Sequence, residues 1–534
     1  MGKALKIVHR FLSGRHDSTV RCPYPLPATV LRKLAMCFLA AGLLTSVPLA
    51  TQPAQGQNLP TLGDTSREDL SPLAERKLGQ QIMNVVRRDP DFIDDGPVSE
   101  YLNRLGNKLL DAHPDARGEA AYDFEFFAVR DPTLNAFAFP GGFIGFHSAL
   151  ILTAQTESEL ASVMGHEIGH VAQRHIARML TSQKYDSLIP LAALALAVLA
   201  SRSSPDAAIA LAAGGQGLAI QKQLNFSRDA EREADRVGLQ ILRDGGFDPN
   251  GMVNFFGRLQ ASMRNYTDNA PEFLRSHPLT SERIADIQSR TLQLPYKQYV
   301  DSLEFFLTKA RIRVLQDSSI QGLIDAKAFF DNQLKSPREE DKIPAIYGLS
   351  FVAFKQRDYP KAQQYLDSAR SELDKLPAQK NILDYSCMFA NLQTDILLAE
   401  NRNDEAVKTA EKAMKHLPLS RAMVYQYVDA LIADHQEEPA AAFLREQVVL
   451  YRQDAKLQNQ LASVYALQGK QALQHIALAQ AYAINGEWQP AMQQLDIART
   501  EKDAQYYELS VIDAYSREWK DSYKEELAEQ KKKR

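Results

Sequence analysis

The stretch "MGHEIGHVAQRH", residues 164–175, carries two histidines, His166 and His170, four positions apart. On a helix, positions i and i+4 share one face, so both imidazoles can reach a single ion. Glu167 is one step further round, where it can reach a water held by that ion. This spacing predicts a catalytic zinc site with Glu167 as general base. The alternative is an amphipathic helix with two surface histidines.

The helix that carries this motif is expected to begin at Thr156, because Thr156 and Glu159 have the spacing of a capping box. Its pattern predicts one continuous helix as far as Ser182. His175 comes five positions after His170 and falls off the ligand face, so we expect a structural or surface role for it.

A third ligand is expected from "NFSRDAEREADRVGLQIL", residues 225–242, which predicts a second helix. Glu231 and Asp235 share one face of it. They fit the roles of a metal ligand and of a carboxylate that holds a ligand histidine by its other ring nitrogen. Spacing alone leaves two alternatives open: Glu233 as the ligand, or a solvated face of alternating charges.

Aromatic, alternating segments before the motif predict strands at residues 121–131 and a strand-turn-strand unit at 134–150, with a proline that places part of it at a sheet edge. One segment of this unit has two interpretations. It is either an edge strand that pairs with an extended substrate backbone or an ordinary hairpin. Its residues are Asn135, Ala136, Phe137 and Ala138.

The C-terminal half is helical in pattern and repeats itself. The segments at 349–369 and 478–498 place Leu, Ala and small residues at the same offsets, which is the tetratricopeptide spacing of helix, turn and helix. Partial matches and a degenerate copy at 422–450 bring the expected number of repeats to about four. The alternative is an arbitrary helical bundle. Such repeats offer an extended surface for protein partners.

Residues 1–56 have the pattern of an export signal, with basic residues before an apolar run at 34–50 and small residues after it. The alternative is a retained membrane anchor, although the run is slightly short for a span. Cys22 and Cys37 lie in this signal, so the mature chain has no internal disulfide, which is compatible with a bacterial periplasm. A net charge of −4 gives no electrostatic reason to expect a nucleic-acid partner.

A second apolar stretch, "LIPLAALALAVLA" at 188–200, is too short to span a bilayer. It predicts either a buried helix or, over residues 188–213, a mobile lid that gates the active site.

Four segments in order, "NAFAFPGGFI", "HEIGH", "SRDAEREAD" and "SHPLTSERI", resemble the metallopeptidase family that includes HtpX and the CAAX prenyl endopeptidases. The resemblance covers roughly residues 70–295. It implies one Zn²⁺ per chain, held by His166, His170 and Glu231, with Asp235 behind a histidine. Those relatives are multi-span membrane proteins; this chain departs from them, because we expect one export signal and no later span.

The resemblance also implies a site role for His277, in "SHPLTSERI". If it bound the zinc, it would exclude the water and leave the enzyme latent. If it stood off, it would stabilise the oxyanion. The alternative is a histidine that merely precedes a helix.

The predicted fold is mostly α. We expect a signal peptide at 1–56, a linker at 57–70, a zincin-type α+β zinc metallopeptidase domain at 71–298 and an α-helical tetratricopeptide repeat solenoid at 299–534.

The combination of signal, peptidase and repeats resembles periplasmic family members, which implies quality control and assembly of outer-membrane β-barrel proteins. The implied partners are these proteins, their assembly machinery and misfolded peptide substrates; peripheral membrane contact is compatible with this. The rival hypothesis is a chaperone or assembly adaptor with latent peptidase activity. A structural zinc site is disfavoured, because closed sites usually include cysteine and Cys387 lies in the repeats.

Overall fold

The computed structural model describes residues 71–118, 122–181, 227–263, 273, 276–294, 299–376 and 380–532. They all belong to one compact unit, Asp64–Arg534. The predicted signal peptide, the linker at 57–70 and the apolar stretch at 188–213 lie outside the described residues. Within the described part of the chain, no helix is both long and apolar enough to cross a membrane.

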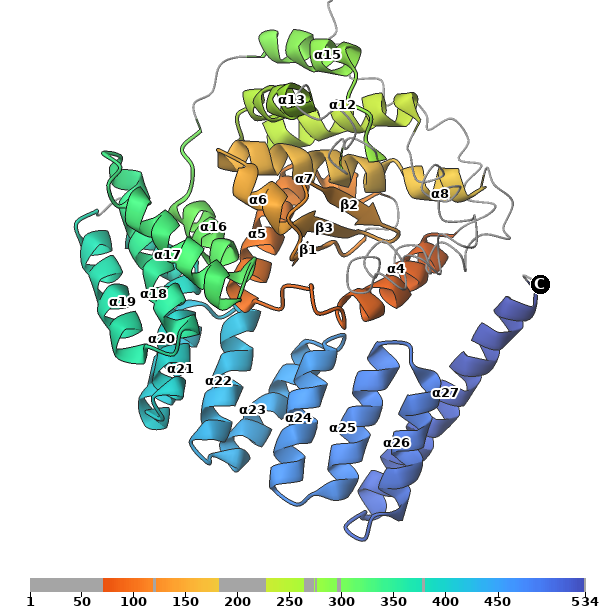
Figure 1. Ribbon diagram of the computed structural model, residues 1–534. Coiled ribbons are helices and arrows are strands. Elements are labelled where there is room, and N and C mark those ends of the chain that lie inside the picture. The colour runs from red at the N-terminus through yellow and green to blue at the C-terminus, as the bar shows by residue number, and fades with distance from the viewer. Residues whose placement is uncertain are drawn as a thin grey trace, which may run out of the picture. The chain divides into compact units, whose positions relative to one another are not determined.

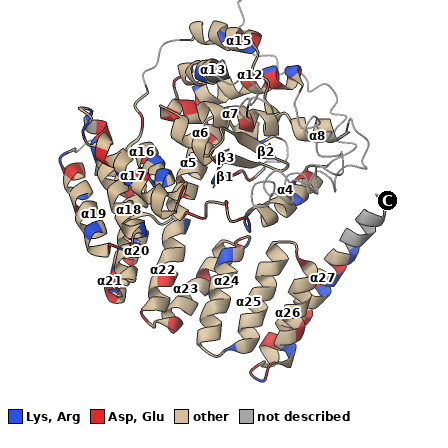
Figure 2. Cartoon of the chain, in the orientation of Figure 1, with Lys and Arg blue, Asp and Glu red and all other residues tan. Residues whose placement is uncertain are grey.

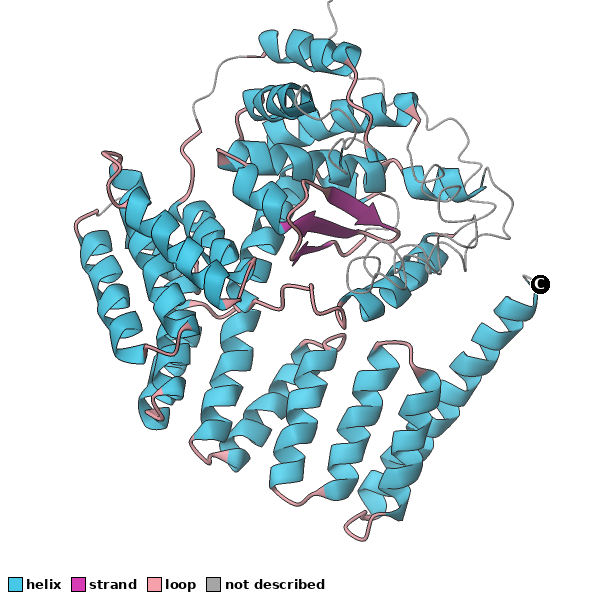
Figure 3. Ribbon diagram, viewed as in Figure 1, coloured by secondary structure: helices cyan, strands magenta, loops and turns pink. Residues whose placement is uncertain are grey.

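A three-stranded sheet lies among the helices of the N-terminal part (Figure 3). Strand β1 (Glu125–Val129) runs parallel to β3 (Phe143–His147), and β3 pairs antiparallel with β2 (Ala136–Phe139). The order β1-β3-β2 places β2 at an edge, which confirms the predicted strand-turn-strand unit. Gly141 and Gly142 have φ of 79° and 91°, conformations that glycine adopts without strain, and so they close the turn.

The motif-bearing helix α7 (Glu157–Ala172) begins as predicted. The Thr156 hydroxyl accepts a hydrogen bond from the Glu159 amide at 3.2 Å, and the Glu159 carboxylate accepts one from the Gln155 amide at 2.6 Å. The other elements of this part are α4 (Pro72–Val86), α5 (Gly96–Ala112), η1 (Pro114–Arg117), α6 (Ser148–Thr153), α8 (His175–Thr181), α12 (Arg228–Asp244), α13 (Asn250–Met263) and α15 (Ser281–Leu292).

The predicted continuous helix through Ser182 is wrong, because the chain turns between α7 and α8. Arg174 has φ of 51°, which is uncommon for a bulky residue. Its guanidinium donates to the buried Glu75 carboxylate of α4 at 2.8–2.9 Å, and the Tyr122 hydroxyl donates to the same carboxylate at 2.6 Å. These contacts, with residues far away in the sequence, hold Arg174 in its turn.

The core of the N-terminal part lies between the sheet and the helices α5, α7, α12 and α13. Tyr101, Phe126, Phe146, Leu160 and Phe256 are all buried in it. Burying one such side chain stabilises the fold by about 1.5–3 kcal/mol. The sheet and α7 are therefore fixed to each other by apolar packing.

The C-terminal part consists of successive helices joined by short turns (Figure 1). Basic and acidic positions are interspersed along these helices (Figure 2). The elements are α16 (Leu303–Leu315), α17 (Ile320–Gln333), η2 (Glu339–Asp341), α18 (Lys342–Lys355), α19 (Tyr359–Asp374), η3 (Lys380–Asp384), α20 (Met388–Ala399), α21 (Asn403–His416), α22 (Arg421–Ala433), α23 (Glu437–Leu450), α24 (Ala455–Leu467), α25 (Gln471–Ile484), α26 (Trp488–Thr500) and α27 (Tyr506–Lys532).

Five turns of this part share one backbone conformation. Positive φ occurs at Arg357, Asn401, His435, Gly469 and Gly486. After each of these residues, the next amide donates to the carbonyl five residues earlier, as from Gln436 to Leu431 at 2.8 Å, which is a Schellman closure. Asn401, His435 and Gly469 recur at intervals of 34 residues, the tetratricopeptide period. The predicted repeat architecture is confirmed, including the degenerate copy at 422–450.

Helix α16 contributes to two hydrophobic cores. Its Phe305 and Ile312 pack in the core of the N-terminal part, whereas Leu307 and Val314 pack with α17, α18 and α19. The helix therefore joins the two parts through apolar contacts on both of its sides. The domain boundary at 298/299 stays a prediction.

A buried arginine on the same helix joins the two parts through polar contacts. Arg311 donates to both oxygens of Asp95 at 2.7 and 2.8 Å, to the Tyr347 hydroxyl at 2.9 Å and to the Asn391 side chain at 2.8 Å. Burial alone lowers the pKa of Arg311, but the Asp95 carboxylate outweighs this effect and raises it above its usual value. Asp95 is also the N-cap of α5. Arg311 therefore connects the start of α5 with α18, through Tyr347, and with α20, through Asn391.

Replacing Arg311 with alanine leaves the buried Asp95 carboxylate without its cation. We expect the free energy of unfolding to fall by about 3–5 kcal/mol, measured by urea denaturation. The control is Arg402→Ala, whose exposed ion pairs are screened by solvent and should leave the unfolding midpoint unchanged. Equal midpoints for Arg311→Ala and wild type would show that this junction is not stabilising.

Candidate metal and active site

The site depends on a close crossing of α7 and α12. A Cβ at Gly165 would lie 3.0 Å from the carbonyl oxygen of Gly238, and a Cβ at Gly169 would lie 2.9 Å from that of Ala234. A Cβ at Gly238 would lie 2.9 Å from the backbone of Gly165. Glycine at these positions lets the two backbones touch, and the carboxylates of α12 then reach the histidines of α7.

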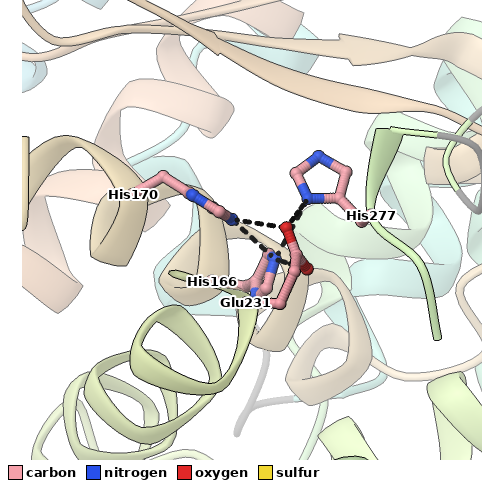
Figure 4. Close-up of side chains that lie close together, drawn as sticks. All are labelled: His166, His170, Glu231 and His277. Atoms are coloured by element: carbon pink, nitrogen blue, oxygen red, sulfur yellow. Dashed lines mark hydrogen bonds and ion pairs between the residues drawn. The ribbon is translucent and has the colours of Figure 1, made fainter. Parts of the chain in front are cut away.

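Four side chains converge at this crossing (Figure 4). The candidate ligand atoms of His166, His170, Glu231 and His277 all lie within 4.8 Å of one another, and all four residues are buried. Glu231 is central: its carboxylate oxygens lie 3.6 Å from His166 Nε2, 3.4 Å from His170 Nε2 and 3.0 Å from His277 Nδ1. The structure therefore brings the three predicted ligands together and adds His277 to them.

Glu167 lies beside this cluster and is fully buried. Among the described residues, neither of its carboxylate oxygens accepts a hydrogen bond, and His277 Nε2 is 3.6 Å away. Burial raises the pKa of Glu167. A buried carboxylate without a hydrogen bond is costly, so this position suits a group that exchanges protons with a bound reactant.

The donor set fits a transition metal. Imidazole and carboxylate ligands together are typical of zinc and of related divalent ions, and this cluster contains no thiolate. A divalent cation would also compensate the buried negative charge of Glu231. The residues present therefore fit a divalent metal, with His166, His170 and Glu231 as the residues that would hold it.

The ring nitrogen of His166 that faces away from Glu231 has its own partner. Asp235 Oδ1 lies 3.0 Å from His166 Nδ1, where the sequence had placed it. Arg283 of α15 donates to both oxygens of Asp235 at 2.6 and 2.7 Å, and its Nη1 lies 2.7 Å from Glu231. Although burial opposes it, Arg283 and His166 hold the pKa of Asp235 below its usual value.

Sequence reasoning missed Arg283. It is one of many arginines on amphipathic helices, and its only signal is its place in "SHPLTSERI", six positions after His277. Its burial, at 3% exposure, is what sets it apart. It neutralises charge behind the candidate ligands.

The ring of His170 has a different neighbour. His175 Nδ1 lies 2.9 Å from His170 Nδ1, and His175 Nε2 lies 3.1 Å from Glu233, which also accepts a hydrogen bond from Arg178 at 3.0 Å. His175 is 3% exposed, so of the two expected roles the surface one is wrong and a structural one is consistent with its burial. Glu233 bonds to His175 and is not part of the ligand cluster, so the structure does not favour it as a ligand.

The segment predicted to bind substrate contributes to the sheet edge beside α7. Ala136, Phe137 and Ala138 belong to β2, and Asn135 precedes it, its carbonyl accepting a hydrogen bond from the His147 amide at 3.0 Å. Its pairing with a substrate stays a prediction.

Comparison with known proteins places these features in a family. The model of peptidase family M48 matches residues 98–291. The putative β-barrel assembly-enhancing protease of Vibrio cholerae is 38% identical over 321 residues, which are 59% of this chain and 64% of that protein. The β-barrel assembly-enhancing protease of Yersinia pestis is 30% identical over 435 residues, covering 82% of this chain and 86% of the relative. The corresponding protease of Escherichia coli K12 is 29% identical over 471 residues, covering 88% and 93%.

Among solved structures, the tetratricopeptide repeat domain of P58(IPK) is similar over 68% of this chain and 99% of that one, at 13% identity and a TM-score of 0.12. A score this low carries no argument about the fold. The repeat architecture rests on the turns described above.

The crossing of α7 and α12 can be tested at Gly238. We expect Gly238→Ala to separate the two helices and to lower the free energy of unfolding by about 1–3 kcal/mol, measured by thermal denaturation. The matched control is Gly257→Ala in α13, where an added Cβ meets nothing within 4 Å. That change should stabilise the helix by up to about 1 kcal/mol. If both variants shifted stability alike, the close approach would not be limiting.

Proposed function

This chain belongs to peptidase family M48 and is a metalloendopeptidase, and we propose that it is zinc-dependent, with His166, His170 and Glu231 as its metal ligands and Glu167 as its general base. The observation that carries this proposal is the buried cluster of the three ligands beside Glu167, whose carboxylate accepts no hydrogen bond from the residues that the structure describes. Three protein ligands leave a position open for water or substrate, as a catalytic zinc site requires.

When bound, the metal ion supplies a Lewis acid that polarises a peptide carbonyl and acidifies water. Glu167 takes a proton from the attacking water and later delivers it to the leaving amine. Its desolvated position favours this role, since a raised carboxylate pKa makes both proton transfers easier near neutral pH. Asp235, paired with Arg283, keeps the ring of His166 in place.

We also propose that His277 is a latch. Its Nδ1 lies 3.0 Å from Glu231 and its Nε2 lies 3.6 Å from Glu167, so its ring stands between a ligand and the general base. A histidine there competes with substrate and water for the open position. The alternative role, stabilising the oxyanion, would require the ring to stand off from Glu231.

The proposed substrates are misfolded outer-membrane β-barrel proteins, in the periplasm. This rests on the names of the bacterial relatives and on the predicted export signal at 1–56. The repeats would bind these proteins or their assembly machinery. The edge strand β2 beside α7 would pair with an extended substrate backbone. The adaptor hypothesis differs in assigning the main activity to the repeats.

Replacing Glu167 with glutamine tests the general base. The variant should keep one zinc per chain, because Glu167 is not a proposed ligand, but casein cleavage should fall by about 10²–10⁴-fold. Zinc content and cleavage rate are measured on the same sample. Cleavage equal to that of wild type would refute the proposed mechanism. A wild-type protein that holds zinc, never cleaves and still supports β-barrel assembly would favour the adaptor hypothesis.

Replacing His277 with alanine distinguishes its two roles. A latch predicts faster casein cleavage than wild type, since the open position is freed, whereas an oxyanion-stabilising residue predicts cleavage slower by about 10²–10³-fold. Zinc content should remain at one per chain in either case. A rate equal to that of wild type would exclude both roles.

A further inference from the structure

The two candidate ligand histidines of α7 are held from behind by different groups. His166 faces a carboxylate directly, through Asp235 at 3.0 Å. His170 faces another histidine, since its Nδ1 lies 2.9 Å from His175 Nδ1. The carboxylate on this side, Glu233, is one residue further out, 3.1 Å from His175 Nε2.

The positions of the ring hydrogens of His175 and His170 can be assigned from their hydrogen-bond partners. Glu233 accepts only, so it favours the His175 tautomer that carries its proton on Nε2. His175 Nδ1 is then an acceptor, and the 2.9 Å contact requires His170 to donate from Nδ1. His170 is left with a bare lone pair on Nε2, the atom that faces Glu231 at 3.4 Å. In this arrangement the two contacts of the His175 ring, at 2.9 Å to His170 and 3.1 Å to Glu233, each join one donor and one acceptor.

The turn at Arg174 creates this contact. On a continuous helix, positions five apart point in different directions, so His175 could not meet His170 from behind. The left-handed conformation of Arg174 separates α7 from α8, which begins at His175. The turn brings the His175 ring into contact with the His170 ring. The buried Glu75 carboxylate holds Arg174 in this turn at 2.8 Å. An uncommon backbone conformation is therefore maintained where it orients a ligand.

We infer that His175 is a positioning residue, backed by Glu233, which fixes the tautomer and orientation of the metal ligand His170. This inference rests on the proposed function, because it takes His170 to be a ligand. It gives His175 and Glu233 a role that their spacing in the sequence did not suggest. Outer partners of ligand histidines typically change metal affinity by about 10–100-fold when removed.

The test measures metal binding itself on the full mature chain, with Zn²⁺ alone as the probe. Zinc affinity is determined by competition with a chromophoric chelator for wild type, His175→Ala and Glu233→Ala. Arg178→Ala is the matched control, because Arg178 donates to the same Glu233 carboxylate but is not part of the His175 contact under test. Co²⁺ absorption spectra report ligand geometry, and the melting temperature of the metal-free protein reports the fold.

We expect His175→Ala to weaken zinc binding about 10–100-fold and to shift the Co²⁺ spectrum. Glu233→Ala, at a partly exposed position where folding is not at risk, should weaken binding less and leave the metal-free melting temperature unchanged. Arg178→Ala should keep wild-type affinity and spectrum.

Two results would overturn the inference. One is zinc affinity and a Co²⁺ spectrum in His175→Ala and Glu233→Ala equal to those of wild type. The other is an equal loss in Arg178→Ala, which would show a general charge effect. Failure of wild type to bind Zn²⁺ or Co²⁺ would instead refute the proposed metal site itself, so the two failures are distinguishable.

Discussion

The whole site depends on how closely the backbones of α7 and α12 approach. Packed helices are usually 8–10 Å apart, with side chains filling the space between them. Here Gly165, Gly169 and Gly238 remove those side chains, and their hydrogens face carbonyl groups of the opposite helix. The short side chain of Asp235 can then reach a histidine ring of α7. These three glycines are therefore needed for the candidate metal site as much as its histidines are.

Charge is the second constraint, because the crossing buries carboxylates together with imidazoles. Removing ionised groups from water is costly unless each one is paired. Arg283 supplies one permanent cation, shared between Asp235 and Glu231. The remaining balance depends on the histidines, whose neutral forms are the ones that bind metal. The pocket is thus organised by the ion pairs of Arg283 with Asp235 and Glu231.

Periodicity predicted much of this protein, and contacts between distant residues account for what it missed. Helical spacing placed His166 and His170 on one face and Glu231 and Asp235 on one face of a second helix, the family resemblance selected Glu231 as the ligand, and the recurring offsets of the C-terminal half predicted the repeats. Spacing could not separate Glu231 from Glu233, since both lie on one helix and only its rotation against α7 decides between them. The roles of Arg283 and Arg311, and the turn at Arg174, depend on partners that no local pattern reveals.

Helix α16 has a consequence for how the molecule responds to force and heat. Helix α16 is shared by two hydrophobic cores, because its opposite sides are buried in different ones. If α16 moves away from one core, it also exposes apolar side chains that it buries in the other. Loosening of the repeats would therefore propagate to the core that supports α7, so we expect the N-terminal part and the repeats to melt as a single cooperative unit.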